Sequence, residues 1–355
     1  MINEEKDKIQ DNAVKLSESY PSLLLSFATG VGKSLAAIKI IERNSEEDWY
    51  ILCKETNHIG NWLKEFITHN KEHLLNKVKI FCYDSLHKYI GTKANLVLDE
   101  GHAITELRLK QIKQINANKV VILSATVEED KKFLLQQITG SLKEYHISIG
   151  DAIAKGLLPA PKVYIVDIEL NQEQRLAYNK LSNSVDYFKL KYLQTREQGY
   201  EFKWLNTALK RKQFLSNCKT AKAKELLQEL KSKRLVCFTG SIQQCIDLGG
   251  KYVVHSKNKD RADIIRRFNN QSIDKLFAVN MLREAMNLTN IEAGMIVQLD
   301  NKKLSFIQML GRVFRADLPE CYVLVVKNTQ DEKYLETVLE GFDTKYLYKY
   351  EEKIN

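Results

Sequence analysis

Short apolar runs alternate with amphipathic stretches over the first 150 residues of the chain. Each run is long enough for one buried strand, and the stretches between them, such as residues 59–67, place apolar residues at helical spacing. This alternation predicts an α/β fold with a mostly parallel sheet covered on both faces, which binds ligands at the carboxyl ends of its strands. The predicted strands are residues 23–27, 49–53, 78–82, 96–98 and 120–126.

A second series of strands follows a break in the pattern. Pro159 and Pro161 lie in a segment that can neither continue a helix nor pair in the centre of a sheet, so we expect a domain boundary there. Residues 171–222 are helical in pattern. We predict two parallel-sheet lobes in tandem, residues 1–150 and 151–355, with the helical insertion at the start of the second. The strands of the second lobe are predicted at residues 163–170, 233–239, 252–254, 276–279, 295–299 and 322–326.

Composition narrows the class of protein. With 44% hydrophobic and 28% charged residues the chain resembles an ordinary globular protein, and no apolar run reaches the roughly 18 residues of a membrane span. The six cysteines form no Cys-x-x-Cys pair, so we expect neither a disulfide framework nor a structural zinc site. The net charge of +9 favours a polyanionic partner. We therefore expect a cytoplasmic protein that does not associate with a membrane.

The first apolar run ends in Ala-Thr-Gly-Val-Gly-Lys-Ser. Backbone N–H groups around Thr29, Gly30 and Gly32, together with the start of the next helix, can surround a polyphosphate. Lys33 would then reach the terminal phosphates and Ser34 would hold Mg²⁺. The alternative is a simple glycine turn at the end of a strand.

Two later strands also release polar side chains at their carboxyl ends. Asp99 and Glu100 follow one of them, where Asp99 can ligate Mg²⁺ and Glu100 can polarise an attacking water. Ser124 and Thr126 end the next, and their hydroxyl groups suit a hydrogen-bond relay between a nucleotide site and a nucleic-acid site. By themselves these residues also fit helix caps.

In the second half, Arg312 and Arg315 stand one helical turn apart in Gln-Met-Leu-Gly-Arg-Val-Phe-Arg. Side chains at that spacing project together, and two guanidinium groups can stabilise the charge of a phosphoryl-transfer transition state. The alternative is an exposed basic helix.

Together these stretches resemble the motifs of the DExH-type superfamily 2 helicases and translocases. Ala-Thr-Gly-x-Gly-Lys-Ser, Asp-Glu-Gly-His and Ser-Ala-Thr stand in the order of motifs I, II and III, and Gln-x-x-Gly-Arg-x-x-Arg is similar to motif VI. Phe27 replaces the first glycine of the strict phosphate-loop pattern, and Ala285 replaces the usual glycine of motif V. The resemblance implies two RecA-like lobes, with ATP and Mg²⁺ between them and nucleic acid across both.

The resemblance also implies roles for further residues. Gln308 would act with the catalytic residues Lys33, Asp99, Glu100, Arg312 and Arg315, and Gln10 takes the place of a glutamine that reads adenine. His102 would join Ser124 and Thr126 in coupling the nucleotide site to the nucleic-acid site. Gln10 also fits an ordinary surface helix, and Ser or Thr at strand ends often only caps a helix. The implied nucleic-acid contacts are Lys54, Thr56, Ser85, Thr239, Ser241 and Asn280.

The insertion at 171–222 is strongly basic, with eleven basic against four acidic residues. One interpretation is a surface that grips nucleic acid through Lys210, Arg211 and Lys212 while Trp204 stacks on bases. The other is a helical bundle whose aromatic residues form its core and whose lysines are solvated.

We therefore expect an ATP-dependent DNA helicase or translocase, monomeric, acting on duplex, forked or branched DNA. Asp-Glu-Gly-His and Asn-Trp-Leu-Lys-Glu-Phe resemble Swi/Snf-type translocases, whereas motifs I and III resemble phage branch-migration helicases and restriction translocases. Small size and a Lys-, Asn- and Ile-rich composition favour a phage origin, which would place the protein in the host cytoplasm. The alternatives are an RNA helicase and a nucleotide-switched nucleic-acid-binding module without motor activity.

Overall fold

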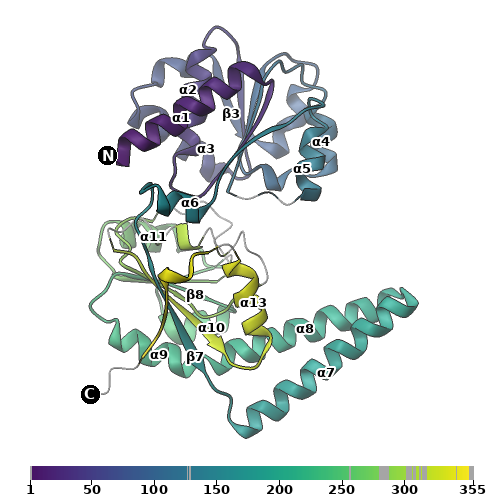
Figure 1. Ribbon diagram of the computed structural model, residues 1–355, viewed down its shortest axis with the longest axis vertical. Coiled ribbons are helices and arrows are strands. Elements are labelled where there is room, and N and C mark those ends of the chain that lie inside the picture. The colour runs from purple at the N-terminus through teal and green to yellow at the C-terminus, as the bar shows by residue number, and fades with distance from the viewer. Residues whose placement is uncertain are drawn as a thin grey trace. The chain divides into compact units, whose positions relative to one another are not determined.

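The chain divides into two compact units, Met1–Leu158 and Pro159–Asn355 (Figure 1). The computed structural model describes residues 2–125, 127, 129–255, 257–279, 288–300, 306, 309–311, 313, 318–340 and 342–351. The division falls directly before Pro159, in the segment where the prolines predict a boundary. It lies later than the division after residue 150, because helix α6 (Ile149–Ala154) spans that position as one continuous element.

The first unit contains a six-stranded sheet in which every pair is parallel, with strand order β3-β2-β4-β5-β1-β6. Strands β1, β2, β4 and β5 are buried along their whole length, which explains why each reads as a continuous apolar run. Strand β6 was not predicted, because this edge strand is rich in polar residues and only its last residue, Ile147, is buried. The strands are β1 Ser22–Phe27, β2 Trp49–Cys53, β3 Val78–Cys82, β4 Asn95–Leu98, β5 Val120–Ser124 and β6 Lys143–Ile147.

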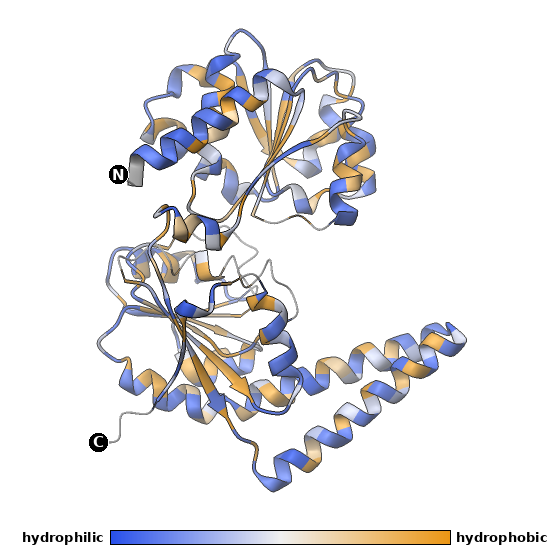
Figure 2. Cartoon of the chain, in the orientation of Figure 1, coloured by the Kyte–Doolittle hydropathy of each residue, from blue (hydrophilic) through white to orange (hydrophobic). Residues whose placement is uncertain are grey.

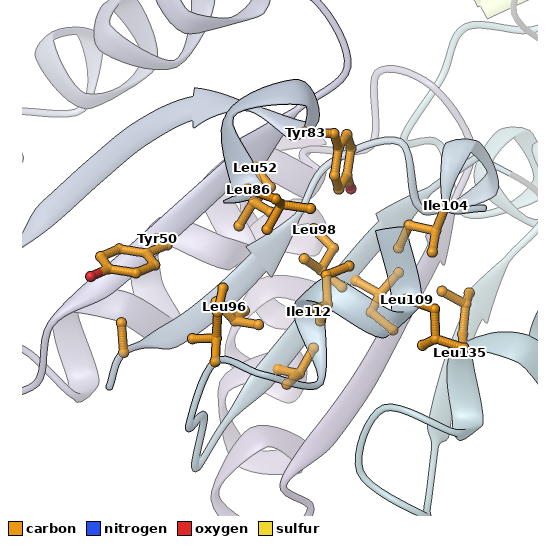
Figure 3. Close-up of a cluster of buried hydrophobic side chains, with 14 of the residues drawn as sticks. Tyr50, Leu52, Tyr83, Leu86, Leu96, Leu98, Ile104, Leu109, Ile112 and Leu135 are labelled. Atoms are coloured by element: carbon orange, nitrogen blue, oxygen red, sulfur yellow. The ribbon is translucent and has the colours of Figure 1, made fainter. Parts of the chain in front are cut away.

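Helices connect and cover these strands. Figure 3 shows Leu52, Leu96 and Leu98 of the sheet in one apolar cluster with Leu109 and Ile112 of α4. Burial of such side chains stabilises the fold by about 1.5–3 kcal/mol each relative to exposure. Besides α6, the unit contains α1 Ile2–Ser19, α2 Lys33–Arg43, α3 Thr56–Thr68, α4 Glu106–Ile112, α5 Glu129–Gln136 and 3-10 turns at Glu72–Asn76, Tyr83–Tyr89 and Gly101–Ala103.

The second unit contains a seven-stranded sheet, again entirely parallel, in the order β13-β7-β12-β11-β8-β10-β9. The strand predicted at 295–299 lies at 293–296 instead, because Ala293 and Gly294 extend it at its start although neither residue favours a strand. Short edge strand β13 was not predicted. The strands are β7 Lys162–Ile168, β8 Leu235–Thr239, β9 Val253–Val254, β10 Lys275–Val279, β11 Ala293–Ile296, β12 Glu320–Val326 and β13 Leu347–Lys349.

Two long helices, α7 (Gln172–Thr195) and α8 (Gln198–Cys218), form an antiparallel hairpin that projects from the sheet of the second unit (Figure 1). The helical insertion predicted at 171–222 therefore ends earlier, because α9 begins at Thr220 and continues to Glu229 against the sheet. The described part of this unit also contains α10 Ile242–Gly249, α11 Arg261–Asn269, α13 Gln330–Leu339 and a 3-10 turn at Thr344–Tyr346.

A buried ion pair fixes the base of the hairpin. Lys219 lies between α8 and α9, and its Nζ is 2.6 Å from Asp331 Oδ2 on α13, with both side chains fully buried. The same carboxylate oxygen accepts a hydrogen bond from the Val326 backbone N–H. Burial lowers the pKa of Lys219, and the charge of Asp331 opposes that shift. The pair therefore joins the hairpin to α13 and β12.

We expect Lys219→Met to lower the free energy of unfolding of the second unit by about 3–5 kcal/mol, because Asp331 would remain buried without its counter-ion. The measurement is urea unfolding of the full chain. Lys222→Met is the matched control: its partner Glu225 is exposed, 3.2 Å away, and this pair contributes about 0–1 kcal/mol. Equal shifts in both variants would show that the buried pair does not hold the hairpin base.

Candidate nucleotide site

Three adjacent strands of the first sheet converge on the predicted site. In the order β4-β5-β1, the phosphate loop follows β1, Asp99 and Glu100 follow β4, and Ser124 ends the strand between them. The strands are parallel, so their carboxyl ends meet at one edge of the sheet. The fold thus brings together groups that lie up to about a hundred residues apart in the sequence.

The phosphate loop has the backbone of an anion site. Gly30 and Gly32 have φ angles of +91° and +102°, which residues with a side chain rarely adopt. Gly32 caps α2 without a side-chain hydrogen bond, so the first N–H groups of the helix remain available to a phosphate. Lys33 Nζ donates to the Phe27 carbonyl at 2.8 Å, and burial lowers the pKa of this lysine. Thr29 and Ser34 are both partly buried in the same turn.

Gln10 lies against this loop rather than on an exposed helix face. Its side chain on α1 is only 2% exposed, and its Nε2 lies 2.6 Å from where a Cβ atom at position 32 would be placed. No side chain fits at Gly32 unless Gln10 moves. Within the described part of the chain, Gln10 Oε1 is buried and accepts no hydrogen bond. The structure therefore places Gln10 beside the phosphate loop, where its Oε1 could accept a hydrogen bond from a ligand.

The two carboxylates after β4 sit in a tight turn. Glu100 has left-handed backbone angles (φ +53°, ψ +54°), a conformation that costs about 1–3 kcal/mol and clusters at functional sites. Gly101 is required next, because a Cβ there would lie 2.4 Å from the Ile122 side chain on β5. Burial raises the pKa of Glu100, and the charge of Asp99 raises it further while Lys33 opposes the shift. Such an environment suits a group that orients or deprotonates water.

Three buried side chains hold Asp99 in place. Trp62 Nε1 donates to Asp99 Oδ2 at 3.0 Å, and His58 Nδ1 lies 3.6 Å from the same oxygen. Tyr83 donates its hydroxyl to the Asp99 backbone carbonyl at 2.8 Å. Asp99 Oδ1 accepts the Glu100 backbone N–H at 3.0 Å. Residues of α3 thus hold the side chain of Asp99, and Tyr83, in the turn after β3, holds its backbone carbonyl.

The hydrogen bond from Trp62 to Asp99 can be tested by substitution. Trp62→Phe keeps the buried ring and removes the donor, and losing such support for a metal-binding carboxylate typically costs about 10–100-fold in metal affinity or activity. If the chain hydrolyses ATP with Mg²⁺ on Asp99, as the sequence predicts, the Mg²⁺ concentration for half-maximal hydrolysis should rise by about that factor. Trp49→Phe is the control, because Trp49 is equally buried and donates to the Asn44 carbonyl at 3.2 Å. The same Mg²⁺ dependence in both variants would refute the role of Trp62.

The predicted coupling residues form a chain of contacts. His102 Nδ1 lies 3.2 Å from Glu100 Oε2 and 3.3 Å from the hydroxyl of Ser124, which is buried at the end of β5. The polar path predicted at this edge of the sheet therefore begins at the proposed catalytic carboxylate. Thr126, the other predicted hydroxyl, lies outside the described residues.

The remaining predicted contacts differ in their surroundings. In the first unit, Lys54, Thr56 and Ser85 follow β2 and β3 at the sheet edge that carries Asp99. In the second, the Thr239 hydroxyl is buried against backbone carbonyls, and Ser241 caps α10 by accepting the Gln244 N–H at 3.1 Å. Ser241 therefore fits the alternative role of a helix cap. Asn280, Gln308, Arg312 and Arg315 lie outside the described residues.

The hairpin residues predicted to contact nucleic acid mostly serve the hairpin itself. Arg211 is 9% exposed and donates to Ser182 Oγ and Gln330 Oε1, so its guanidinium group is committed to the base of the hairpin. Lys212 Nζ lies 3.8 Å from Asp300 Oδ2. The burial of Arg211 therefore fits the alternative of a helical bundle rather than a contact with nucleic acid. Lys210 is exposed.

Trp204 packs within the hairpin. Its ring stacks on Tyr192 of α7 with centroids 6.0 Å apart and an interplanar angle of 28°. Lys189 Nζ lies 5.8 Å from the ring centroid of Trp204. This position fits the alternative in which the aromatic residues form the core of a helical bundle.

The residues that sequence reasoning missed are Trp62, His58 and Tyr83. The sequence offers one signal for the first two: they stand four residues apart, which places them on one face of a helix that follows a strand. That they surround Asp99 follows only from the sheet order, which sets β2 beside β4.

The fold defines the class of protein as two tandem RecA-like α/β lobes, and the loop after β1 of the first lobe has a backbone that suits a polyphosphate. Asp99 and Ser34 supply oxygen ligands that fit Mg²⁺, which usually binds one or two carboxylates together with substrate phosphates. Among the described residues no group of three His, Cys, Asp or Glu side chains could hold a metal by itself. No helix in the described ranges is long and apolar enough to cross a membrane.

Comparison with known proteins finds similarity to helicases and to a DNA translocase. Residues 214–317 match the family described as Helicase conserved C-terminal domain. The chain is 23% identical to DNA 3'-5' translocase XPB2 of Sulfurisphaera tokodaii, over 92% of this chain and 84% of that protein.

Two solved structures share the fold. One is S. cerevisiae Dbp5 bound to RNA and ADP BeF3, with a TM-score of 0.65 at 12% identity, covering 97% of this chain and 89% of that one. The other is the Pyrococcus furiosus Hef helicase domain, with a TM-score of 0.57 at 12% identity, covering 93% and 96%. The two parallel-sheet lobes predicted from the sequence are confirmed by this likeness.

Proposed function

We propose that the chain is an ATP-dependent DNA helicase or translocase that couples ATP hydrolysis to movement on, or remodelling of, duplex or branched DNA. The observation that carries the proposal is the convergence of the phosphate loop, the Asp99–Glu100 turn and Ser124 at one edge of the first sheet. The helicase family match in the second unit supports it, as does the relative whose name describes a DNA translocase.

The residues of the first lobe would act as follows. Lys33 and the N–H groups of Gly30, Gly32 and the first turn of α2 would bind the phosphates, and Gln10 would contact the base. Ser34 and Asp99 would hold Mg²⁺, which neutralises charge on the phosphates. Glu100 would orient the attacking water, and His102 and Ser124 would connect its position to the nucleic-acid surface.

The second lobe would complete the reaction. Arg312 and Arg315 would stabilise the charge that develops on the transferred phosphoryl group, with Gln308 beside them. Cycles of nucleotide binding and hydrolysis would close and reopen the lobes, which would move Lys54, Thr56 and Ser85 of one lobe relative to Asn280 of the other along a strand.

Substrate class is tested by measuring duplex unwinding and displacement of a triplex-forming strand, on matched DNA and RNA substrates of the same sequence. The proposal predicts ATP-dependent activity on forked or duplex DNA and little on RNA. Activity confined to RNA would establish an RNA helicase instead. ATP-dependent binding that never displaces a strand would establish a nucleotide-switched binding module.

A further inference from the structure

The two glycines of the phosphate loop are covered by residues from the two ends of the first unit. Gln10 of α1 lies against Gly32, and the last residue of the unit, Leu158, lies against Gly30. A Cβ atom at position 30 would lie 3.1 Å from Leu158 Cδ2, which is closer than ordinary van der Waals contact. Among the described residues outside the loop, no other atom lies within 4 Å of that position. Leu158 is therefore the residue that packs on this part of the loop.

A turn at the end of α6 holds Leu158 in place. The backbone N–H groups of Leu157 and Leu158 both donate to the Ala152 carbonyl, at 2.8 and 3.2 Å. Gly156 has a φ angle of +66°, the left-handed conformation that commonly ends a helix. The side chain of Leu158 is only 6% exposed. Both its backbone and its side chain are thus fixed within the first unit.

The strand that leads into the loop has no room to move. Strand β1 is buried along its whole length, and Figure 2 shows apolar residues along the strands at the centre of the first sheet. Close-packed interiors resist displacement. No element of the first unit follows Leu158 in the chain. A shift of the loop at Gly30 would therefore be taken up by Leu158 rather than by β1.

The loop itself has two possible arrangements. In this structure Lys33 Nζ donates to the Phe27 carbonyl at 2.8 Å, across the residues that would surround a phosphate. A phosphate group carries negative charge and would take the ammonium group from the neutral carbonyl. Occupied and empty loops would therefore differ in the contacts of residues 27–33, and coupling between distant sites requires an element with two such states.

The connection from Leu158 to the second unit is short and stiff. Only Pro159, Ala160 and Pro161 separate it from β7. Each proline fixes its own φ angle and restricts the residue before it, so this connection cannot behave as a flexible linker. Strand β7 pairs with β12 along its whole length. A displacement of Leu158 would therefore pass into the second sheet.

We propose that Leu158 is a positioning residue that transmits the occupancy of the phosphate loop to the connection between the lobes. The inference rests on the proposed function, because it needs a nucleotide in the loop. Bound phosphates would hold the loop against Leu158 and keep the turn after α6 closed, and their release would let the turn open. This route is separate from Arg312 and Arg315, which would contact the nucleotide directly.

The test measures hydrogen–deuterium exchange of the Leu157 and Leu158 amides in the full chain, with and without the non-hydrolysable ATP analogue AMP-PNP and Mg²⁺. These amides donate to Ala152, so they exchange only when the turn opens. If opening releases the loop, the analogue at about ten times its Kd should slow their exchange about tenfold. Unchanged exchange with the analogue bound would overturn this inference alone, whereas a chain that binds no analogue would overturn the proposed function as well.

Substitutions separate this contact from general packing. Leu158→Ala removes the side chain from Gly30, so the analogue should no longer change the exchange rate. Leu158→Met keeps a similar volume and should retain the tenfold effect. Leu157→Ala is the matched control, because Leu157 is also buried, at 2% exposure, but has no atom within 4 Å of the Cβ position at residue 30. It should speed exchange equally with and without the analogue. Loss of the analogue effect in both alanine variants would refute the role of Leu158.

Discussion

Replacing Glu100 by glutamine should abolish most ATP turnover while leaving nucleotide binding intact. The amide keeps the size and polarity of the side chain but cannot accept the proton of the attacking water, and the loss of such a base lowers kcat by about 10²–10⁴-fold. The strained turn and the packing of Gly101 against Ile122 should be unaffected, because neither involves the Glu100 carboxylate. The measurements are steady-state ATPase rates and the Kd for a fluorescent ATP analogue.

Glu106→Gln serves as the control for this change, because Glu106 is an exposed residue of α4 in the same lobe. It should leave both quantities unchanged. If Glu100→Gln hydrolyses ATP as fast as the unmodified chain, the Asp99–Glu100 turn is not the catalytic site.

Replacing Lys33 by alanine should instead weaken the interaction with nucleotide in both the ground state and the transition state. Its side chain lies in the loop that would surround the phosphates, where burial lowers its pKa, and a bound anion would stabilise the charged form again. Removing one preorganised donor to a reacting oxyanion costs about 10²–10³-fold in rate, and we expect a loss of that order in kcat/KM.

Lys39→Ala is the matched control for this variant. Lys39 lies on the same helix but pairs with Asp7 and Asp11 of α1, each at 3.0 Å, away from the loop. It should retain ATPase activity with a small loss of stability, about 0–1 kcal/mol for such exposed pairs. A loss of activity equal to that of Lys33→Ala would mean that any disturbance of α2 inactivates the protein.

The sequence predicted the buried strands best, because a strand covered on both faces must be apolar at nearly every position. β1 and β5 are recognisable for that reason. The edge strands β6 and β13 were missed, since an exposed edge places no such demand on their residues. The prolines mark the division between the units, since the first unit ends at Leu158, whereas a division after residue 150 would cut through α6.

The sequence predicted those residues of the candidate site whose side chains are themselves reactive or charged. Lys33, Asp99 and Glu100 are reactive groups at strand ends, and a reader of the sequence can expect parallel strands to bring them together. Trp62 and Tyr83 could not be assigned, because indole and phenol groups in apolar surroundings look like ordinary core residues until their hydrogen bonds to Asp99 are seen.

The hairpin shows the limit of reasoning from charge. Arg211 lies in a basic run and reads as a solvent-exposed contact, yet the heptad-like seam of α7 and α8 encloses it. The same seam turns Trp204 inward and leaves leucines outside. Which face of a helix is buried depends on its partner helix, and the apolar residues of α7 and α8 occur on more than one face.

The proposed function requires that this chain be an ATPase whose turnover depends on nucleic acid. The most direct test is the ATP hydrolysis rate of the full chain, with Mg²⁺, measured alone and then with saturating forked duplex DNA. We expect a rate that rises at least about tenfold with DNA, corresponding to about 1.4 kcal/mol of transition-state stabilisation. A rate that no DNA or RNA substrate changes, or the absence of hydrolysis altogether, would contradict it.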